Sequence, residues 1–123
     1  MVTAKIISTI PHFIIDCSAN ILAQVSEMEI LKAVHTITDA SGLFVKEDIK
    51  VRINPYNVFD VGGKQTDFIH VFSYILEGRT AEQKAALSKD VVRILTAIFP
   101  DVEFIAMNVD EFAIAGYCNK YLL

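Results

Sequence analysis

Two copies of one helix-start signal, each placed after an apolar run, constrain the fold of this chain more than any other feature. In the segments Ser26–Glu29 and Thr80–Gln83, a hydroxyl residue is followed three positions later by Glu or Gln. This spacing is typical of a capping box, in which the two side chains bond to backbone amides at the start of a helix. We therefore predict one helix over residues 27–40 and a second that runs to Phe99.

Four segments with the pattern of β-strands flank these helices. They are residues 10–17, 49–53, 67–77 and 102–109. Residues 49–53 alternate between apolar and polar, which is the period of a strand with one buried face, so Lys50 and Arg52 should project together from the polar face. Residues 67–77 are apolar on both faces, and we expect both faces to be covered.

The order strand, helix, strand, repeated once, predicts an α+β fold with a four-stranded mixed sheet and two helices on one face. The other face of such a sheet is bare in a single chain. Three sheets that close on one another would cover it, so burial favours a cyclic oligomer. A ferredoxin-like regulatory domain has the same element order, and the pattern alone leaves that alternative open. We expect residues 110–123 to form a tail that docks on a neighbour.

Composition excludes several classes of protein. The 123 residues suit one domain, and a hydrophobic fraction of 53% is high for a monomer of this size, which favours self-association. No apolar run is long enough to span a membrane, and the net charge of −4 argues against a nucleic-acid partner. Cys17 and Cys118 lack the spacing of a metal site, and we expect two reduced thiols packed as small hydrophobes. Residues 1–10 carry no apolar run long enough for a secretory signal, so we expect a cytoplasmic protein.

The most specific motif begins at Pro11. The segment Pro11–Ile21 reads PHFIIDCSANI and resembles the first residues of the mature 5-carboxymethyl-2-hydroxymuconate isomerases, a branch of the tautomerase superfamily. Further stretches extend the resemblance over most of the chain: Phe68–Val71, Gly78–Thr80 and the pair Lys50 and Arg52.

This resemblance implies a single tautomerase-like domain over residues 11–123, preceded by an extension of residues 1–10. It also implies a tautomerase fold and a homotrimer with active sites at the subunit boundaries. The implied activity is a cofactor-free 1,3-proton shift that converts a carboxylated hydroxymuconate-type dienol, formed in the catabolism of aromatic compounds, to its ketone.

Pro11 is the expected general base, because the mature chains of that family begin with the matching proline. A keto-enol shift needs a base with a pKa near the working pH, and an N-terminal amine starts close to that range. In this chain ten residues precede Pro11, and an acylated nitrogen offers no base. Proteolysis after Ile10, or translation that starts at position 10, would free the amine. Without such a step, Pro11 is a strand-edge proline and the chain a catalytically silent binding or assembly protein.

Arg79, Lys50 and Arg52 are the expected substrate-binding residues. The resemblance assigns Arg79 to a substrate carboxylate, and its place before a helix N-terminus suits an anion. The family has an arginine where this chain has Lys50, which keeps the charge but loses the forked geometry. Arg52 matches a second family arginine. From the residues alone, Arg79 also fits a solvated loop arginine, and Arg52 fits a surface charge.

The remaining polar and aromatic candidates have plainer roles. We expect His12 to point away from Pro11, because neighbouring residues of a strand face opposite sides. His70 should be a hydrogen-bonded histidine of the core or an interface, and Asp16 a carboxylate at a strand end or interface. Phe44 and Phe59 are candidates for the walls of a substrate pocket.

Overall fold

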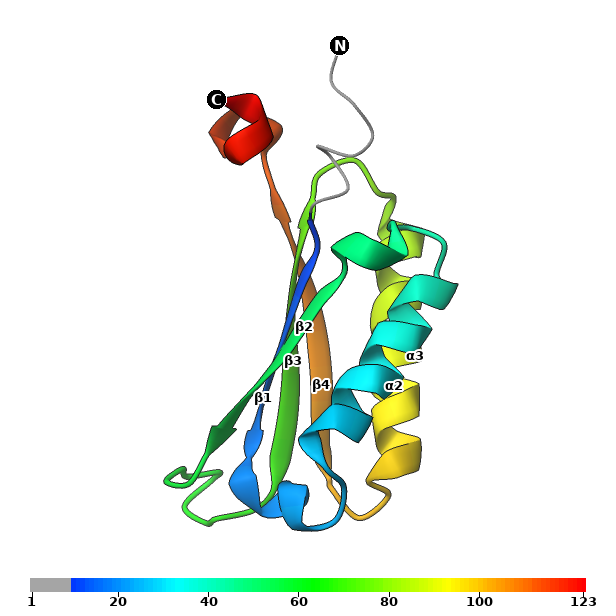
Figure 1. Cartoon of the computed structure of the whole chain (residues 1–123). Coiled ribbons are helices and arrows are strands. Elements are labelled where there is room, and N and C mark those ends of the chain that lie inside the picture. Colours follow the sequence, from blue (N-terminus) through cyan, green and yellow to red (C-terminus); the bar gives the residue numbers. More distant parts are fainter. Residues whose placement is uncertain (1–9) are drawn as a thin grey trace.

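The chain forms one four-stranded sheet with two helices packed on a single face (Figure 1). The computed structural model describes residues 10–123. The strands and main helices are β1 His12–Ser18, α2 Glu27–Ala40, β2 Lys50–Tyr56, β3 Phe68–Leu76, α3 Ala81–Ile98 and β4 Phe104–Phe112. Short 3-10 turns occupy Ala19–Ala23, Lys46–Asp48, Ile114–Gly116 and Lys120–Leu122. Apart from Ile10, the predicted extension lies outside the described residues.

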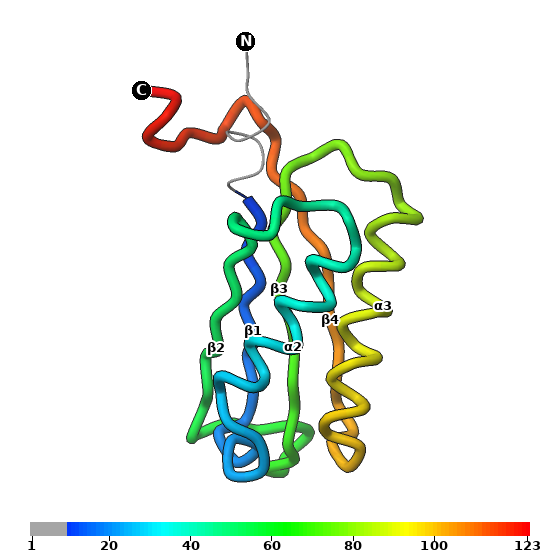
Figure 2. The backbone as a smooth tube through the Cα atoms, turned by 45° about the vertical axis from the view of Figure 1, so that its right-hand side comes forward, coloured from blue at the N-terminus to red at the C-terminus, as the bar shows by residue number. Residues whose placement is uncertain are grey.

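The strand order is β2-β1-β3-β4, as Figure 2 shows from left to right. Strand β1 runs parallel to β2 and antiparallel to β3, and β3 runs parallel to β4. Helix α2 therefore connects the neighbouring strands β1 and β2, and α3 connects β3 and β4. This arrangement confirms the predicted tandem repeat with a mixed sheet.

The main core lies between the sheet and the two helices. Its largest fully buried side chains include Phe13, Ile15, Ile30, Ile69, Leu87, Leu95 and Phe99. Cys17 belongs to this core, and burial, helped by the nearby Asp16 and Glu27 carboxylates, raises the pKa of its thiol to about 11. The prediction of a packed thiol is thus confirmed for Cys17 and wrong for Cys118, which is exposed.

Both helices start where the capping pattern predicts. At α3 the box is complete: the Gln83 amide donates to Thr80 Oγ1 over 3.1 Å, and the Thr80 amide donates to Gln83 Oε1 over 2.9 Å. At α2 the Ser26 hydroxyl accepts from the Glu29 amide over 3.3 Å and donates to the Glu29 carboxylate over 3.2 Å. The sequence pattern therefore located both helix starts, although only the second forms the reciprocal box.

Two strands run further than their sequence patterns indicate. Strand β2 continues through Pro55 because it is an edge strand, where a missing amide donor is tolerated. Strand β4 extends to Phe112, which pairs with Leu76, so residues 110–112 belong to the sheet and the predicted tail is shorter. The polar residues Asp110 and Glu111 obscured this strand, because an edge strand can expose them.

The second face of the sheet, which we call the open face, is uncovered within one chain. Half-buried aromatic residues of β3 lie on it, among them Phe72 and Tyr74. Hydrogen bonds join polar side chains across it, as between His70 Nε2 and Asn108 Oδ1 at 2.6 Å. The expectation that both faces of β3 are covered is therefore confirmed for the helix side, and cover of the open face by neighbouring chains stays a prediction. Among residues 10–123, no helix combines the length and apolar character of a membrane span.

Candidate active site

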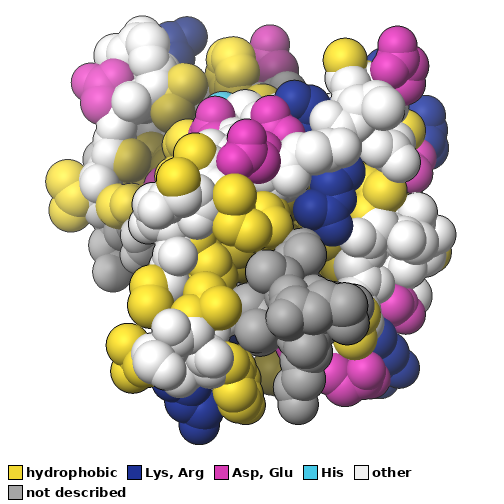
Figure 3. Space-filling view, turned by 90° about the horizontal axis from the view of Figure 1, so that it is seen from above, with side chains coloured by type: hydrophobic (Ala, Val, Ile, Leu, Met, Phe, Trp, Pro, Cys, Tyr) yellow, Lys and Arg dark blue, Asp and Glu magenta, His cyan; other side chains and the backbone are white. Residues whose placement is uncertain are grey.

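The start of β1 and the end of β3 meet at one end of the sheet, which we call the upper end (Figure 1). The Lys50 amide donates to the Pro11 carbonyl over 3.2 Å, so β2 also begins there. Continuing the antiparallel register past β1 places Pro11 beside Ile75. The upper end thus gathers Pro11, Lys50 and the loop that carries Arg79. Figure 3 looks down on this end and shows acidic, basic and apolar side chains intermixed.

Pro11 is buried at the upper end. It follows the same alternation as Phe13, which faces the helices, and so lies on the helix side of the sheet. Its ring nitrogen forms the peptide bond to Ile10. Ile10 is itself buried, with only 2% of its surface exposed. Because resonance draws the nitrogen lone pair into the peptide group, Pro11 cannot take up a proton while Ile10 is attached.

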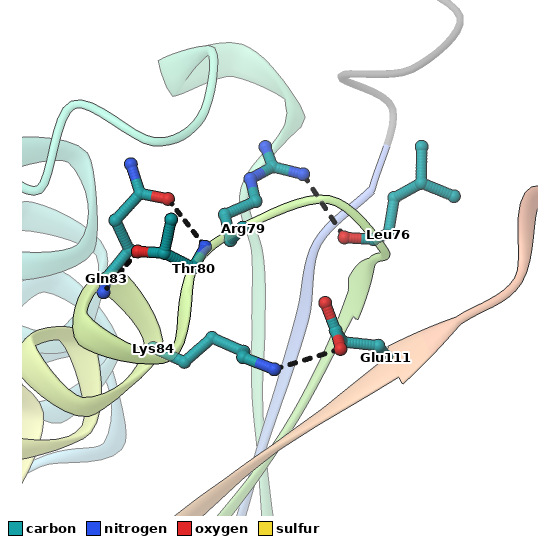
Figure 4. A network of polar contacts seen from close by, with 6 residues as sticks. All are labelled: Leu76, Arg79, Thr80, Gln83, Lys84 and Glu111. Carbon is teal, nitrogen blue, oxygen red and sulfur yellow. Dashed lines mark hydrogen bonds and ion pairs between the residues drawn. The ribbon is translucent and has the colours of Figure 1, made fainter.

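Arg79 is held by backbone carbonyls on two sides. Its Nη2 donates to the Leu43 carbonyl over 2.7 Å, and its Nη1 donates to the Leu76 carbonyl over 3.3 Å. Figure 4 shows the guanidinium reaching back over the end of β3 toward Leu76. The side chain is half-buried rather than solvated, so its head is fixed relative to the loop after α2 and the end of β3.

Phe44 lies at this site and Phe59 does not. The Phe44 ring lies 5.0 Å from the Arg79 guanidinium carbon and packs edge-on against Phe13, with ring centroids 6.0 Å apart. Phe59 packs against Phe68, at the other end of β3. The chain of contacts from Phe13 through Phe44 to Arg79 connects the strand that follows Pro11 with the expected carboxylate binder.

An ion pair that the sequence analysis missed lies beside Arg79. Lys84 Nζ donates to Glu111 Oε1 over 2.9 Å (Figure 4). The bond from Lys84 lowers the pKa of the Glu111 carboxyl, as do the Gly78 amide and the Arg79 charge. The pair joins residues that are far apart in sequence, and no local pattern signals it. A carboxylate of the chain itself thus lies near the cations at the start of α3.

Lys50 and Arg52 lie on the open face, away from the side that Pro11 faces. Val51 and Ile53 pack on the core, so the residues that alternate with them point outward. Arg52 Nη1 lies 3.2 Å from His12 Nδ1, which must be the acceptor because a guanidinium only donates. Lys50 Nζ donates to the Asp48 carbonyl over 2.8 Å. Within one chain, the structure does not bring these two cations onto the face of Pro11.

His12 points to the open face, as expected from its position after Pro11. Partial burial lowers the pKa of its imidazole, and the charges of Arg52 and Lys50 lower it further. The ring is therefore neutral at neutral pH and can accept the bond from Arg52.

His70 and Asp16 also lie on the open face. His70 stacks on Phe72, with centroids 4.3 Å apart, in addition to its bond to Asn108. Asp16 accepts a bond of 3.4 Å from the Tyr56 hydroxyl. Among residues 10–123, no group of three or more His, Cys, Asp or Glu side chains is arranged to hold a metal ion.

The tandem β-α-β sheet belongs to the tautomerase class of folds, as solved structures show. A 5-carboxymethyl-2-hydroxymuconate isomerase from Deinococcus radiodurans R1 superposes with a TM-score of 0.81 at 20% identity, covering 96% of this chain and 93% of that one. A 5-carboxymethyl-2-hydroxymuconate delta-isomerase gives 0.72 at 12% identity, over 93% and 89%. A fused 4-OT protein, solved as a symmetric trimer, gives 0.75 at 16% identity, over 91% and 94%.

The sequence comparison shows the family of this chain. The sequence model of the 5-carboxymethyl-2-hydroxymuconate isomerases matches residues 11–116, which is most of the chain. This protein therefore belongs to the 5-carboxymethyl-2-hydroxymuconate isomerase family. No curated protein matches the sequence significantly.

Proposed function

We propose that this protein is an isomerase that catalyses a cofactor-free 1,3-proton shift on a carboxylated dienol of the hydroxymuconate type, with Pro11 as the general base. The observation that carries this proposal is the family match, which begins at Pro11 itself. The activity requires a processing or start event that leaves Pro11 as the first residue.

A free Pro11 would be a rigid secondary amine in a largely apolar setting. It takes the hydroxyl proton of the enol, whose O–H electrons form the new carbonyl bond while the double bond shifts. The carbon at the other end of the shifted bond then takes a proton back from the ammonium. The neighbouring Phe13 and Ile75 side chains are 0% exposed, and apolar surroundings of this kind disfavour the charged form of an amine.

We assign the substrate carboxylate to Arg79 and the developing enolate to Lys50 and Arg52. Cations placed where negative charge develops supply much of the rate in such sites. Since Lys50 and Arg52 lie on the open face, we propose that they serve the Pro11 of a neighbouring subunit in a homotrimer. The trimeric assembly of the fused 4-OT relative supports this arrangement.

A second candidate function is a catalytically silent binding or assembly protein with the same fold. The observation that favours it is the buried peptide bond between Ile10 and Pro11, which blocks the amine in the 123-residue chain. In either case we propose a cytoplasmic location, which fits the free thiols of Cys17 and Cys118. We propose a role in aromatic catabolism only for the active form.

Turnover by two forms of the protein tests the proposal. One form is the full chain, and the other begins at Pro11, made by starting translation with Met in place of Ile10 so that trimming exposes the proline. The substrates are 5-carboxymethyl-2-hydroxymuconate and hydroxyphenylpyruvate. We expect activity in the shorter form alone. Pro11→Ala replaces the rigid ring amine with a more mobile primary amine, and turnover should fall by about 10²-fold because the base is no longer held in place. Equal activity of the shorter form and its Ala variant would contradict the mechanism, and inactivity of both forms would favour the silent protein.

A further inference from the structure

Arg79 is fixed by three contacts that act in different directions. Bonds to the Leu43 and Leu76 carbonyls use one N–H of each terminal nitrogen. The Arg79 Cζ atom lies over the face of the Phe44 ring, 5.0 Å from the ring centroid. A guanidinium has five N–H donors, so three remain without a partner among the described residues. The two carbonyls and the ring therefore hold the guanidinium from three directions.

Phe44 is held in place by a contact with Phe13 and by the conformation of its own loop. Its ring packs edge-on against Phe13, with an angle of 76° between the two planes, and Phe13 is fully buried in β1. The loop that carries Phe44 leaves α2 at Ser41, whose hydroxyl donates to the Thr38 carbonyl over 2.6 Å and accepts from the Leu43 amide over 3.2 Å. Gly42 allows the turn with a φ of 73°. The loop thus presents Phe44 and the Leu43 carbonyl to Arg79 as one unit.

The plane of a guanidinium decides whether it can bind a carboxylate with two parallel bonds. If the ring is removed, the two carbonyl bonds still hold the nitrogens, but the head can tilt about the line that joins them. A tilted head offers a carboxylate one bond instead of two. The loss should therefore appear in the binding of carboxylates rather than in the proton transfer at Pro11.

We propose that Phe44 is a positioning residue that orients Arg79 and thereby sets the preference of the site for carboxylated ligands. This inference rests on the proposed function, because it assigns Arg79 to a substrate carboxylate. It assigns no chemical step to Phe44. Leu43 and Phe44 are neighbours in the loop after α2, and both contact the guanidinium.

The test measures binding of adipate, a saturated dicarboxylate, to the full chain by calorimetry. The variants are Phe44→Leu, which keeps apolar volume but loses the π face, and Phe44→Tyr, which keeps the face. Phe59→Leu is the matched control, since Phe59 is a half-buried aromatic at the far end of β3. We expect Phe44→Leu to raise the dissociation constant about five- to tenfold, and the other two variants to stay within about twofold of the unchanged chain.

A second readout uses the form that begins at Pro11. There Phe44→Leu should raise KM for 5-carboxymethyl-2-hydroxymuconate with little change in kcat, because the ring acts on binding alone. Circular dichroism checks that each variant is folded.

Unchanged adipate binding in folded Phe44→Leu would overturn the inference. A Phe44→Tyr variant that binds adipate as weakly as Phe44→Leu would also overturn it. So would the absence of adipate binding by the unchanged chain, which would also remove Arg79 from the proposed site. If instead adipate binding responds to Phe44→Leu while the shorter form shows no turnover, the proposed reaction fails and the positioning role stands.

Discussion

The two faces of the sheet bury their side chains to very different extents, although they alternate along the same strands. On the helix side, Ile15 and Val71 are 0% exposed in a single chain. On the open face, their neighbours Ile14 and Phe72 are only half-buried, and hydrogen-bonded polar groups lie among them. A single chain therefore buries the helix side of the sheet and leaves the open face for other chains to cover.

This difference also divides the candidate site. Pro11 and Arg79 belong to the helix side and the upper end, whereas Lys50 and Arg52 belong to the open face. If the candidates form one site, they must meet across a boundary between chains. The proposed trimer and the proposed reaction thus depend on the same open face.

The largest expected effect compares two adjacent isoleucines of β1. Ile15→Ala should lower the free energy of unfolding by about 2–5 kcal/mol, because it opens a cavity in the core. Ile14→Ala should cost only about 1 kcal/mol in the isolated chain, because its side chain is half-buried there. Urea denaturation measures both values. A cost for Ile14→Ala that grows with protein concentration would show that assembly covers the open face, and equal costs at high dilution would contradict the comparison.

A charge on the open face should break the assembly. Phe72→Glu places a carboxylate where a neighbouring sheet would pack, and we expect the dissociation constant of the oligomer to rise by a factor on the order of 100 or more. Sedimentation equilibrium measures the change. The matched control is Val58→Glu, on an exposed loop residue at 86% exposure, which should leave the assembly unchanged. An oligomer that tolerates Phe72→Glu would show that the open face is not the interface.

The two helix starts provide a smaller comparison. Thr80→Ala removes the hydroxyl of a complete capping box, and Ser26→Ala removes that of a half-formed one. Each should cost about 1 kcal/mol, because each substitution removes the oxygen that accepts from one backbone amide at the start of its helix. The Thr80 amide keeps its bond to the Gln83 side chain in Thr80→Ala, so half of that box survives. Thermal or urea unfolding of the two variants measures both losses. A loss well below about 0.5 kcal/mol at either position would contradict this account of the caps.

The smallest expected effect concerns the pH dependence of stability. Because the pKa of His12 is lower in the folded chain than its ordinary value, the unfolded chain binds more protons between the two values. Stability should therefore be complete above about pH 6.5 and decrease as the pH falls below it. His12→Gln keeps an acceptor for Arg52 without a titrating ring, and it should flatten this part of the curve. Urea unfolding in steps between neutral and mildly acid pH measures the slope, and an unchanged slope would contradict the assignment.

Local patterns in the sequence predicted most of the fold. The capping signals located both helix starts, and the alternation in residues 49–53 predicted which residues of β2 face outward. The end of β4 was missed because Asp110 and Glu111 look like loop residues. Their place in an edge strand depends on the pairing with β3, which no local pattern encodes.

Less of the candidate site than of the fold could be predicted from the sequence. The resemblance suggested Pro11 and Arg79 as candidates, but the surroundings of Arg79 come from distant segments: Leu43 and Phe44 lie in the loop after α2. Residue spacing offered Phe44 and Phe59 as equal candidates, and only the fold separates them. The pair of Lys84 with Glu111 also arises from tertiary packing alone.

The central claim is that Pro11 becomes the first residue of the working protein, and intact mass spectrometry of the protein purified from its native host tests it most directly. The account predicts a major species whose mass corresponds to a chain that begins at Pro11. A preparation that contains only the full 123-residue species would contradict it, because the nitrogen of Pro11 would then stay locked in an amide.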